Sequence, residues 1–281
     1  MKAMVTGGLG FVGSNLVDRL VDLGYEVLVV DDLSSGKEEH RNESAEYIID
    51  DFKNALKEAD TTIDVVFHLA AEARIQPSFE MPLYTCENNS YGSAVVADFA
   101  RRSGCKVVYA GSSSYYGGVY LNPYAFAKWQ GEEAFKMYSA VYNTTCGIAR
   151  FFNVYGPRNP LIGQYTPVVA IFEEQTKANE VLTVVGDGEQ RRDFTHVYDI
   201  CDGLIAISKG DWKGEVFNLG TGTNHSINEL AEMFGGEKKH LPPRPGEARV
   251  TLADISFTTE KTGWKPKHSL EGYVKNFMEN R

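Results

Sequence analysis

The chain has 281 residues, enough to bury one large hydrophobic core or one core with a smaller lobe attached. Its 38 acidic side chains outnumber its 28 basic ones and give a formal net charge of -10, which argues against a surface that binds nucleic acid. No apolar stretch approaches the roughly 18 residues of a membrane helix and no leader precedes the first strand, so we expect a soluble, cytoplasmic protein without a membrane partner.

A strand, Lys2–Thr6, opens the predicted fold and leads through a glycine-rich turn into a helix, Phe11–Leu23. Gly7 permits the tight turn, Gly10 lets a phosphate approach the backbone, and Gly13 lets the helix pack closely on the strand. The N-terminus of this helix offers N–H groups and the positive end of the helix dipole. The segment is therefore typical of a site for the pyrophosphate of a dinucleotide.

A second strand, Glu26–Asp31, ends in an acidic residue about 20 residues after the glycine turn. A carboxylate at Asp31 can accept hydrogen bonds from both hydroxyls of an adenosine ribose, and it repels the 2′-phosphate of NADP. We therefore expect NAD as the cofactor. Asp32 could share this role or be only an acidic loop residue. The four scattered cysteines and six histidines show no ligand spacing, so we expect no metal ion.

Strand-like and helix-like segments continue to alternate through the first half of the chain. Several of the strands are almost continuously apolar, as expected where both faces of a parallel sheet are covered. We therefore predict an α/β fold with a doubly wound parallel sheet of the Rossmann type. The further strands are Tyr47–Ile49, Asp64–His68, Lys106–Ala110 and Thr145–Phe151, and the further helices are Pro82–Arg102 and Tyr124–Tyr142.

The rhythm changes after Asn153, where Gly156–Pro160 breaks the chain. A helix, Val197–Ser208, and a strand, Val216–Leu219, then look like a return to the sheet. The elements before this return are the helix Pro167–Ala178 and the strand Val181–Val184, and the proline-rich stretch Leu241–Gly246 after it leads into a short C-terminal lobe. We predict an NAD-binding domain of residues 1–152, rejoined by residues 193–221, and a smaller, interleaved substrate-binding lobe of residues 153–192 and 222–281.

A tyrosine and a lysine four residues apart, Tyr124 and Lys128, share one face of a predicted helix. A free tyrosine has a pKa near ~10, which is too high for a base at neutral pH. A fixed lysine cation, helped by a positive nicotinamide ring, favours the phenolate and lowers that pKa. Such a pair is also common on protein surfaces. Here it follows a strand that ends in Gly111–Ser114, and the carboxyl ends of parallel strands are where ligands bind, so we predict a catalytic tyrosine.

These segments stand in the order found in one enzyme family. The chain resembles an extended short-chain dehydrogenase/reductase of the nucleotide-sugar epimerase/dehydratase group, and its pattern is closest to that of the UDP-galactose 4-epimerases. The resemblance runs nearly from end to end. Beside the glycine turn, the motifs that carry it are Val30–Gly36, Asp51–Phe52, His68–Ala71, Asn89–Ser93, Tyr116–Gly117, Arg150–Pro157, Arg192–Val197, Arg244–Glu247 and Ala253–Asp254.

The resemblance implies a role for each matching residue. Ser112 corresponds to the catalytic serine or threonine, Tyr124 to the catalytic base and Lys128 to its partner. The residues implied to bind NAD, besides Tyr124 and Lys128, are Gly7, Gly10, Phe11, Val12, Gly13, Asp31, Asp32, Asp51, Phe52, Leu69, Ala70, Ala71 and Asn89, the last of which resembles a structural asparagine of the family. The residues implied to bind a nucleoside-diphosphate sugar are Ser112, Ser113, Asn153, Arg192, Arg244, Glu247 and Thr251. Asn153 could instead cap a turn, Arg192 could pair with Asp193, and Arg244 could order a loop.

The residues after Ser112 select among the reactions of this family, which share a first step. In that step the tyrosine removes the O4 proton of the sugar while the C4 hydride passes to NAD. Dehydratases of the family carry Asp and Glu directly after the serine or threonine, whereas this chain has Ser113 and Ser114, whose hydroxyls cannot do carboxyl acid/base work near neutral pH. We therefore expect 4-epimerisation of a UDP-hexose, with NAD regenerated in every turnover.

A small residue, Thr251, stands where these epimerases carry a size gate. A small side chain there leaves room for a 2-acetamido group, so the resemblance implies tolerance of UDP-GlcNAc and UDP-GalNAc as well as UDP-Glc and UDP-Gal. Thr251 could also merely fill a strand position. Only seven residues, Gly117–Pro123, separate Tyr116 from Tyr124, where relatives usually have a longer loop, and this short segment could open the pocket or alter specificity.

Two other classes of function stay open. A sister enzyme would be a 4-reductase, a 5-epimerase or a C6 decarboxylase, and a decarboxylase needs a cation aimed at a C6 carboxylate. Arg74, Lys37 and Arg249 are candidates for that cation, and we expect solvated surface positions for all three. A module that binds dinucleotide without turnover is the other class, although such modules typically lose the tyrosine or the lysine.

By resemblance we also expect a homodimer. The helices Pro82–Arg102 and Tyr124–Tyr142 of each subunit would form a four-helix interface. Apolar and aromatic side chains on the second helix are compatible with this interface or with ordinary core contacts against the sheet; they are Phe126, Trp129, Phe135 and Tyr138.

Overall fold

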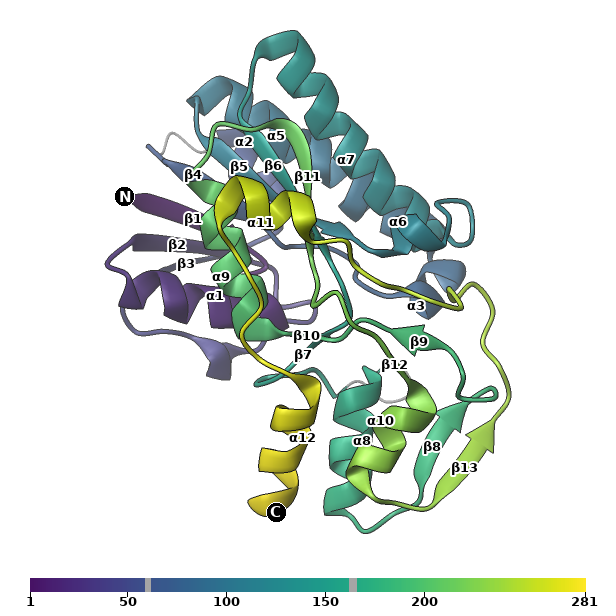
Figure 1. Cartoon of the computed structure of the whole chain (residues 1–281). Helices are drawn as coiled ribbons and strands as arrows, with labels where there is room; N and C mark the ends of the chain where they lie inside the picture. The colour runs from purple at the N-terminus through teal and green to yellow at the C-terminus, as the bar shows by residue number, and fades with distance from the viewer. Residues whose placement is uncertain (59–61, 162–165) are drawn as a thin grey trace.

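Seven parallel strands form the central sheet of the protein, whose computed structural model describes residues 1–58, 62–161 and 166–281. The strand order across the sheet is β11-β6-β5-β4-β1-β2-β3 (Figure 1). The prediction of a doubly wound α/β fold is thus confirmed. The strands are β1 (Lys2–Thr6), β2 (Glu26–Asp31), β3 (Glu46–Ile49), β4 (Val65–His68), β5 (Lys106–Ser112), β6 (Cys146–Phe151) and β11 (Lys213–Leu219).

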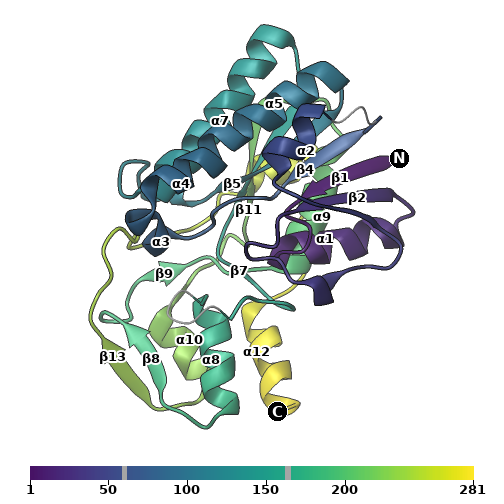
Figure 2. The same cartoon turned by 180° about the vertical axis from the view of Figure 1, so that it is seen from behind.

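Helices cover both faces of this sheet, because successive strand residues point to opposite sides. Ala3 and Val5 of β1 belong to one apolar cluster and Met4 belongs to the other. Figures 1 and 2, which view the molecule from opposite sides, show the two helical layers. The first cluster includes residues of α1 (Phe11–Asp22) and α9 (Val197–Ser208), and the second includes residues of α2 (Phe52–Glu58), α5 (Gly92–Ser103) and α7 (Pro123–Tyr142).

The direction of strand succession reverses between β1 and β4. From β1 the chain runs outward through β2 and β3, and it then crosses back to β4, β5 and β6 on the other side. Such a reversal leaves a crevice at the carboxyl ends of the strands, where the crossover connections diverge. The glycine turn after β1 and Ser112 at the end of β5 both lie at this edge, so the topology itself positions the site.

The helix predicted over Pro82–Arg102 is interrupted. It consists of α4 (Pro82–Cys86), a π-helical turn (Glu87–Tyr91) and α5, which ends at Gly104 in a left-handed conformation, φ +75°. The π turn contains Asn89, whose side chain points inward and hydrogen-bonds the backbone of the segment after β4. Helical periodicity predicts the apolar face of the segment. It does not predict the one additional residue that the π turn contains, and this turn directs the polar side chain of Asn89 inward.

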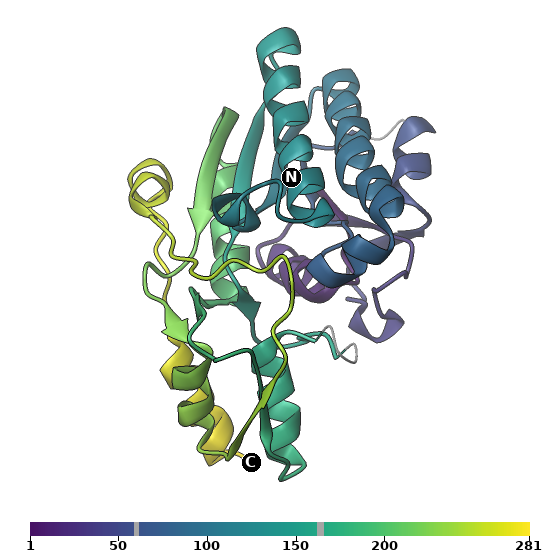
Figure 3. The same cartoon turned by 90° about the vertical axis from the view of Figure 1, so that its right-hand side faces the viewer.

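A smaller lobe hangs from the carboxyl edge of the sheet and has its own apolar cluster (Figure 3). Its strands associate in short pairs: β7 with β10, β8 with β13, and β9 with β12. After β13 the chain rises past the start of α7 toward α11, which lies against β11 (Figure 3). The elements are β7 (Val154–Tyr155), α8 (Val168–Lys177), β8 (Leu182–Val185), β9 (Arg191–Arg192), β10 (Thr195–His196), β12 (His225–Ser226), α10 (Ile227–Phe234), β13 (Lys238–Leu241), α11 (Ser256–Thr262) and α12 (Leu270–Glu279).

After the first part of the smaller lobe the chain returns to the sheet. α9 packs against α1, and β11 pairs with β6 over the register Val216–Ile148 to Leu219–Phe151. Short helices that sequence periodicity did not predict lie at the crevice or the surface: a 3-10 turn (Glu38–His40), α3 (Ile75–Glu80) and α6 (Ser114–Gly117).

Two expectations stay predictions. One is the division of the chain into domains at residue 152, and we note that Trp264, within the segment 222–281, packs in the sheet core. The other is the cytoplasmic location. None of the described helices is both long and apolar enough to cross a membrane.

Candidate active site

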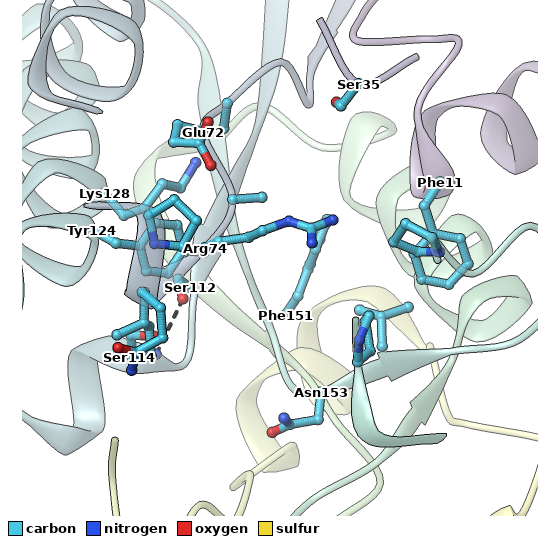
Figure 4. Close-up of a pocket in the computed structure, with 18 of the residues that line it drawn as sticks. Phe11, Ser35, Glu72, Arg74, Ser112, Ser114, Tyr124, Lys128, Phe151 and Asn153 are labelled. Carbon is cyan, nitrogen blue, oxygen red and sulfur yellow. Dashed lines mark hydrogen bonds between the residues drawn. The ribbon is translucent and has the colours of Figure 1, made fainter. Parts of the chain in front are cut away.

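A cavity of about 1060 Å³ occupies the crevice between the sheet and the smaller lobe. Its sheet side is formed by the glycine turn and the ends of β4, β5 and β6, and its other side by residues of the lobe. Figure 4 shows Ser112, Tyr124 and Lys128 on one wall, Phe11 across from them and Asn153 toward the lobe. Residues distant in sequence therefore meet in a single space, as the motifs predict.

The glycine turn leaves no room for side chains. Gly7 has φ +73°, and its N–H donates to the carbonyl of Val30 at 2.8 Å, which ties the turn to β2. A Cβ on Gly13 would lie 2.0 Å from the Gly7 carbonyl oxygen. Gly10 is the N-cap of α1 and provides no side-chain cap, so the N–H groups of the first helical turn remain for a ligand. This cradle fits a pyrophosphate.

Asp31, at the end of β2, has a buried carboxylate that accepts hydrogen bonds from two backbone N–H groups. Its Oδ2 accepts a hydrogen bond from the Leu9 N–H at 2.9 Å, and its Oδ1 accepts one from the Leu33 N–H at 2.9 Å. Burial raises the pKa of Asp31, while these two hydrogen bonds oppose the rise. Asp31 thus holds the glycine turn in place and still lines the cavity, with acceptor capacity left for a ribose. Asp32 is exposed, lines the cavity and caps its own turn at Ser34.

The catalytic candidates come from two elements. Asn122 caps α7 by accepting a hydrogen bond from the Ala125 N–H at 2.7 Å, and the Tyr124 N–H donates to the Ser78 hydroxyl at 3.1 Å. These contacts fix the first turn of the helix, on which Tyr124 and Lys128 share a face. Ser112 ends β5, and its Oγ accepts from the Ser114 N–H at 3.2 Å (Figure 4).

Burial controls the proton affinity of these groups. It raises the pKa of Tyr124, whereas a hydrogen bond with Ser112 lowers that pKa and the charges of Glu72 and Glu132 raise it. Burial also lowers the pKa of Lys128 to about 7, against the opposing charge of Glu132. In the protein without a nicotinamide ring, desolvation therefore outweighs the Ser112 hydrogen bond, because burial disfavours a phenolate. The expected lowering of this pKa by Lys128 and a bound nicotinamide ring stays a prediction.

The cofactor residues implied by the resemblance fall into two groups. Asp51 and Asn89 do not line the cavity, whereas the others do. Asp51 forms an ion pair with Lys53 at 2.8 Å. Asn89 is buried, accepts a hydrogen bond from the Glu72 N–H at 2.9 Å and donates one to the Glu72 carbonyl at 2.8 Å. Its contacts thus hold the loop after β4. The lining residues are Gly7, Gly10, Phe11, Val12, Gly13, Asp31, Asp32, Phe52, Leu69, Ala70, Ala71, Tyr124 and Lys128.

All of the substrate residues implied by the resemblance line the cavity; they are Ser112, Ser113, Asn153, Arg192, Arg244, Glu247 and Thr251. Arg192 is buried, and its guanidinium lies 3.4 Å from the Glu247 carboxylate. Arg192 does not pair with Asp193, because that carboxylate accepts hydrogen bonds from three backbone N–H groups, those of Thr221, Gly222 and Ala253.

Sequence reasoning did not name Glu72 as a site residue, and it named Arg74 only as a candidate cation with an expected surface position. Both lie in the loop after β4, and Figure 4 shows the Arg74 guanidinium reaching between the Tyr124 wall and Phe11. The expected surface position of Arg74 is therefore wrong. The signal was available, because this loop directly follows the His68–Ala71 motif at the carboxyl end of a strand. Lys37 and Arg249 are exposed as expected and pair with Glu39 and Asp187, respectively.

The short segment Gly117–Pro123 rests directly on the loop that carries Arg244 and Glu247. Asn122 donates from Nδ2 to the Gly246 carbonyl at 2.9 Å, and Gln76 donates from Nε2 to the Pro245 carbonyl at 2.9 Å. The start of α7 and the loop that carries Arg244 and Glu247 are thus joined by the same side chain, Asn122.

Comparison with known proteins gives a consistent result. The sequence model of the NAD dependent epimerase/dehydratase family matches residues 3–220. The UDP-glucose 4-epimerase of Mycolicibacterium smegmatis is 34% identical over 314 residues, which cover 100% of this chain and 99% of that protein. The crystal structure of the UDP-glucose 4-epimerase of Thermotoga maritima with UDP-glucose has a TM-score of 0.93 and 33% identity, and covers 99% of this chain and 98% of that one. The UDP-N-acetylglucosamine 4-epimerase of Methanobrevibacter ruminantium, in complex with UDP-N-acetylmuramic acid, has a TM-score of 0.89 and 33% identity, and covers 100% and 99%.

Proposed function

The chain belongs to the NAD-dependent epimerase/dehydratase family, and we propose that it catalyses the 4-epimerisation of a UDP-hexose. The observation that carries the proposal is the single cavity in which Ser112, Tyr124 and Lys128 face a dinucleotide cradle on one side and the substrate loop on the other. The likeness to UDP-glucose 4-epimerases over nearly the whole chain supports it.

Tyr124 is the proposed base. Its phenolate removes the O4 proton of the sugar, directly or through the Ser112 hydroxyl, and the ammonium group of Lys128 stabilises the negative charge. NAD, which the glycine turn and Asp31 would hold, would supply a reversible acceptor for the C4 hydride and the positive charge of a nicotinamide ring. Because burial raises the pKa of Tyr124, the Ser112 hydrogen bond and the Lys128 charge both have to offset desolvation.

The fate of the 4-keto sugar decides the product. Ser113 and Ser114 follow Ser112 where a dehydratase carries carboxylic acids, and the cavity carboxylate Glu72 lies on the Lys128 side instead (Figure 4). With Ser113 and Ser114 in the positions of those acids, the ketone turns about its phosphate linkage and takes the hydride back on the other face. Asn153, Arg192 and Arg244 are proposed to hold the diphosphate during this rotation, since guanidinium groups suit phosphate oxygens.

Proton NMR of the purified protein tests this function. The protein is incubated without added cofactor in separate tubes with UDP-Gal, UDP-GalNAc and UDP-GlcA. Appearance of a 4-epimer is the expected result and indicates NAD that stays bound through turnover. No reaction in any tube, even with added NAD, contradicts UDP-sugar 4-epimerisation and directs the search to dTDP- and GDP-sugars or to a 4-reductase.

One observation favours a second candidate, the decarboxylation of a UDP-hexuronic acid. Arg74 brings a guanidinium group into the cavity, where a C6 carboxylate could bind it. The same experiment separates the two reactions, because epimerisation of UDP-GlcA retains C6 and decarboxylation releases it as CO₂ and leaves a UDP-pentose.

Thr251 is proposed to set the size of the sugar pocket. It is buried, lines the cavity, and its Oγ1 accepts a hydrogen bond from the Asp193 N–H at 3.4 Å. Replacing it by tyrosine is expected to lower kcat/KM for UDP-GalNAc relative to UDP-Gal by about 10- to 100-fold, because the phenol fills the space of the acetamido group. Thr251→Ser, which keeps the hydroxyl, is the matched control. N-acetyl activity that survives the Thr251→Tyr substitution would contradict the size gate.

We further propose a homodimer that pairs through α4, α5 and α7, three helices that lie side by side (Figure 2). Leu83 is 85% exposed and Val141 is 63% exposed on this layer, which leaves apolar surface open. Phe135, by contrast, is buried in the core and cannot contribute to such an interface. Val141→Glu is expected to convert a dimer into a species of 31.2 kDa in sedimentation equilibrium. A wild-type chain that sediments at that mass would refute the dimer.

A further inference from the structure

A buried ion pair stands directly behind the catalytic residues. Glu132 lies one turn beyond Lys128 on α7, and Arg150 lies on β6; they are 1% and 5% exposed. The Arg150 Nε lies 3.0 Å from the Glu132 Oε1, and the Arg150 Nη2 lies 2.6 Å from the Glu132 Oε2. This two-point geometry fixes the plane of the carboxylate as well as its distance.

The ion pair also contacts the segment that carries Ser112. Gly111 immediately precedes Ser112, and a Cβ there would lie 2.9 Å from the Glu132 Oε1 and 3.2 Å from the Arg150 Cγ. On its other side the Arg150 guanidinium carbon lies 3.5 Å from the centroid of the Tyr115 ring. The pair therefore fills the space between α7, which carries Tyr124 and Lys128, and the end of β5, which carries Ser112.

We propose that Glu132 and Arg150 are positioning residues of the active site: they hold α7 against the Ser112 segment, and the Glu132 carboxylate favours the protonated form of Lys128. This inference rests on the proposed function of Tyr124 and Lys128. Neither residue needs to touch substrate or cofactor, and both act through Lys128.

Glu132, one turn beyond Lys128 on the same helix, is a buried carboxylate whose charge opposes the desolvation of the Lys128 ammonium. The Lys128 ammonium lies 4.3 Å from the centroid of the Tyr109 ring, and His68 is buried beside it and uncharged, since burial lowers its pKa to about 3. Burial lowers the pKa of Lys128 to about 7, and the opposing charge comes from Glu132. The ionisable groups around this site are Tyr124 and Glu132 on α7, His68 on β4, Tyr109 on β5, Glu72 in the loop after β4, and Arg150 on β6 behind Glu132.

The pair predicts opposite effects for its two members. Turnover needs Tyr124 deprotonated and Lys128 protonated, so loss of the Lys128 proton forms the alkaline limb of the pH profile. Glu132→Gln removes the anion, so the pKa of Lys128 falls and the limb moves to lower pH. Arg150→Met leaves the carboxylate with Lys128 as its remaining cation, so the pKa rises and the limb moves to higher pH.

The experiment measures the pH profile of kcat for the 4-epimerisation. We expect the alkaline limb of Glu132→Gln to move down by about one pH unit, that of Arg150→Met to move up, and Glu132→Asp to restore most of the wild-type profile. Glu173→Gln, which removes a buried carboxylate in the smaller lobe, is the matched control with an unmoved limb. Lower kcat with limbs that stay at the wild-type pH would reduce the pair to a structural role and overturn the inference.

A double variant and an NMR titration distinguish loss of folding from loss of the proposed effect on Lys128. The double variant Glu132→Gln/Arg150→Met leaves no unpaired buried charge and is expected to fold, with a limb between those of the wild type and Glu132→Gln. A double variant with the wild-type limb overturns the inference even if a single variant fails to fold. ¹⁵N-lysine NMR follows the titration of Lys128 without turnover, so a lowered pKa in Glu132→Gln supports the pair even where the wild type shows no epimerase activity, an outcome that would refute only the proposed function.

Discussion

Tyr124→Phe is expected to lower kcat by about 10²- to 10⁴-fold, because it removes the hydroxyl that exchanges a proton with the sugar O4 and leaves the ring in place. The ring keeps its packing at the first turn of α7, and the turn itself is held by the Asn122 cap and the Ser78 hydroxyl, neither of which involves the phenol oxygen. NAD content and melting temperature should therefore stay close to those of the wild type. The measurement is initial-rate NMR or a coupled assay with UDP-Gal.

Tyr142→Phe is the matched control, since it removes a phenol oxygen at the exposed far end of the same helix. Its kcat should equal that of the wild type. Two results would count against Tyr124 as the base: a Tyr124→Phe variant that retains more than about a tenth of wild-type kcat, or one that loses its NAD and its stability together with its activity. The second result would mean that the phenol supports the structure rather than the reaction.

The sheet could be predicted from the sequence because its signals are local. The strands β1 and β2 have the predicted bounds, and α9 spans the predicted Val197–Ser208. Each is an apolar run bounded by turn residues, and burial on both sides makes such a run almost continuous. The paired strands of the smaller lobe could not be predicted in this way, since β7, β9, β10 and β12 have only two residues each. Two residues carry no periodicity, and their pairing depends on partners far along the chain.

The features of the site that follow from local sequence could also be predicted, whereas those that depend on tertiary packing could not. The spacing of Tyr124 and Lys128 fixes a shared helical face, so their meeting could be predicted from local sequence. The direction of the pKa of Tyr124 could not, because desolvation depends on the tertiary packing around the side chain. Arg74 was assigned to the surface for a related reason: its loop has no periodic pattern, and only the position after β4 brings its side chain into the cavity.

Gly13→Ala is the second substitution for which we expect a large effect, and here the obstacle is backbone. The new Cβ would lie 2.0 Å from the Gly7 carbonyl oxygen, 2.8 Å from the Gly7 carbonyl carbon and 2.8 Å from the Gly8 Cα. The backbone of Gly7 cannot shift to relieve this contact. Its N–H is hydrogen-bonded to the Val30 carbonyl of β2, and the backbone of Ala70 lies directly against it. The N-terminus of α1 must therefore move away from the turn.

The expected result of Gly13→Ala is a loss of stability of about 1–3 kcal/mol or more, together with a fall in bound NAD to about a tenth or less. Gly10→Ala separates the two effects. Gly10 has φ -76°, and a Cβ there would meet only the Gly7 carbonyl oxygen, at 3.3 Å, so the fold should tolerate it. Because Gly10 lines the cavity, the added Cβ would instead obstruct the cofactor. We therefore expect Gly10→Ala to lose NAD and to keep the wild-type melting temperature. Retention of NAD by Gly13→Ala would mean that the pyrophosphate does not depend on this turn, whereas equal destabilisation of the two variants would mean that the close contact at Gly13 is relieved by a local shift.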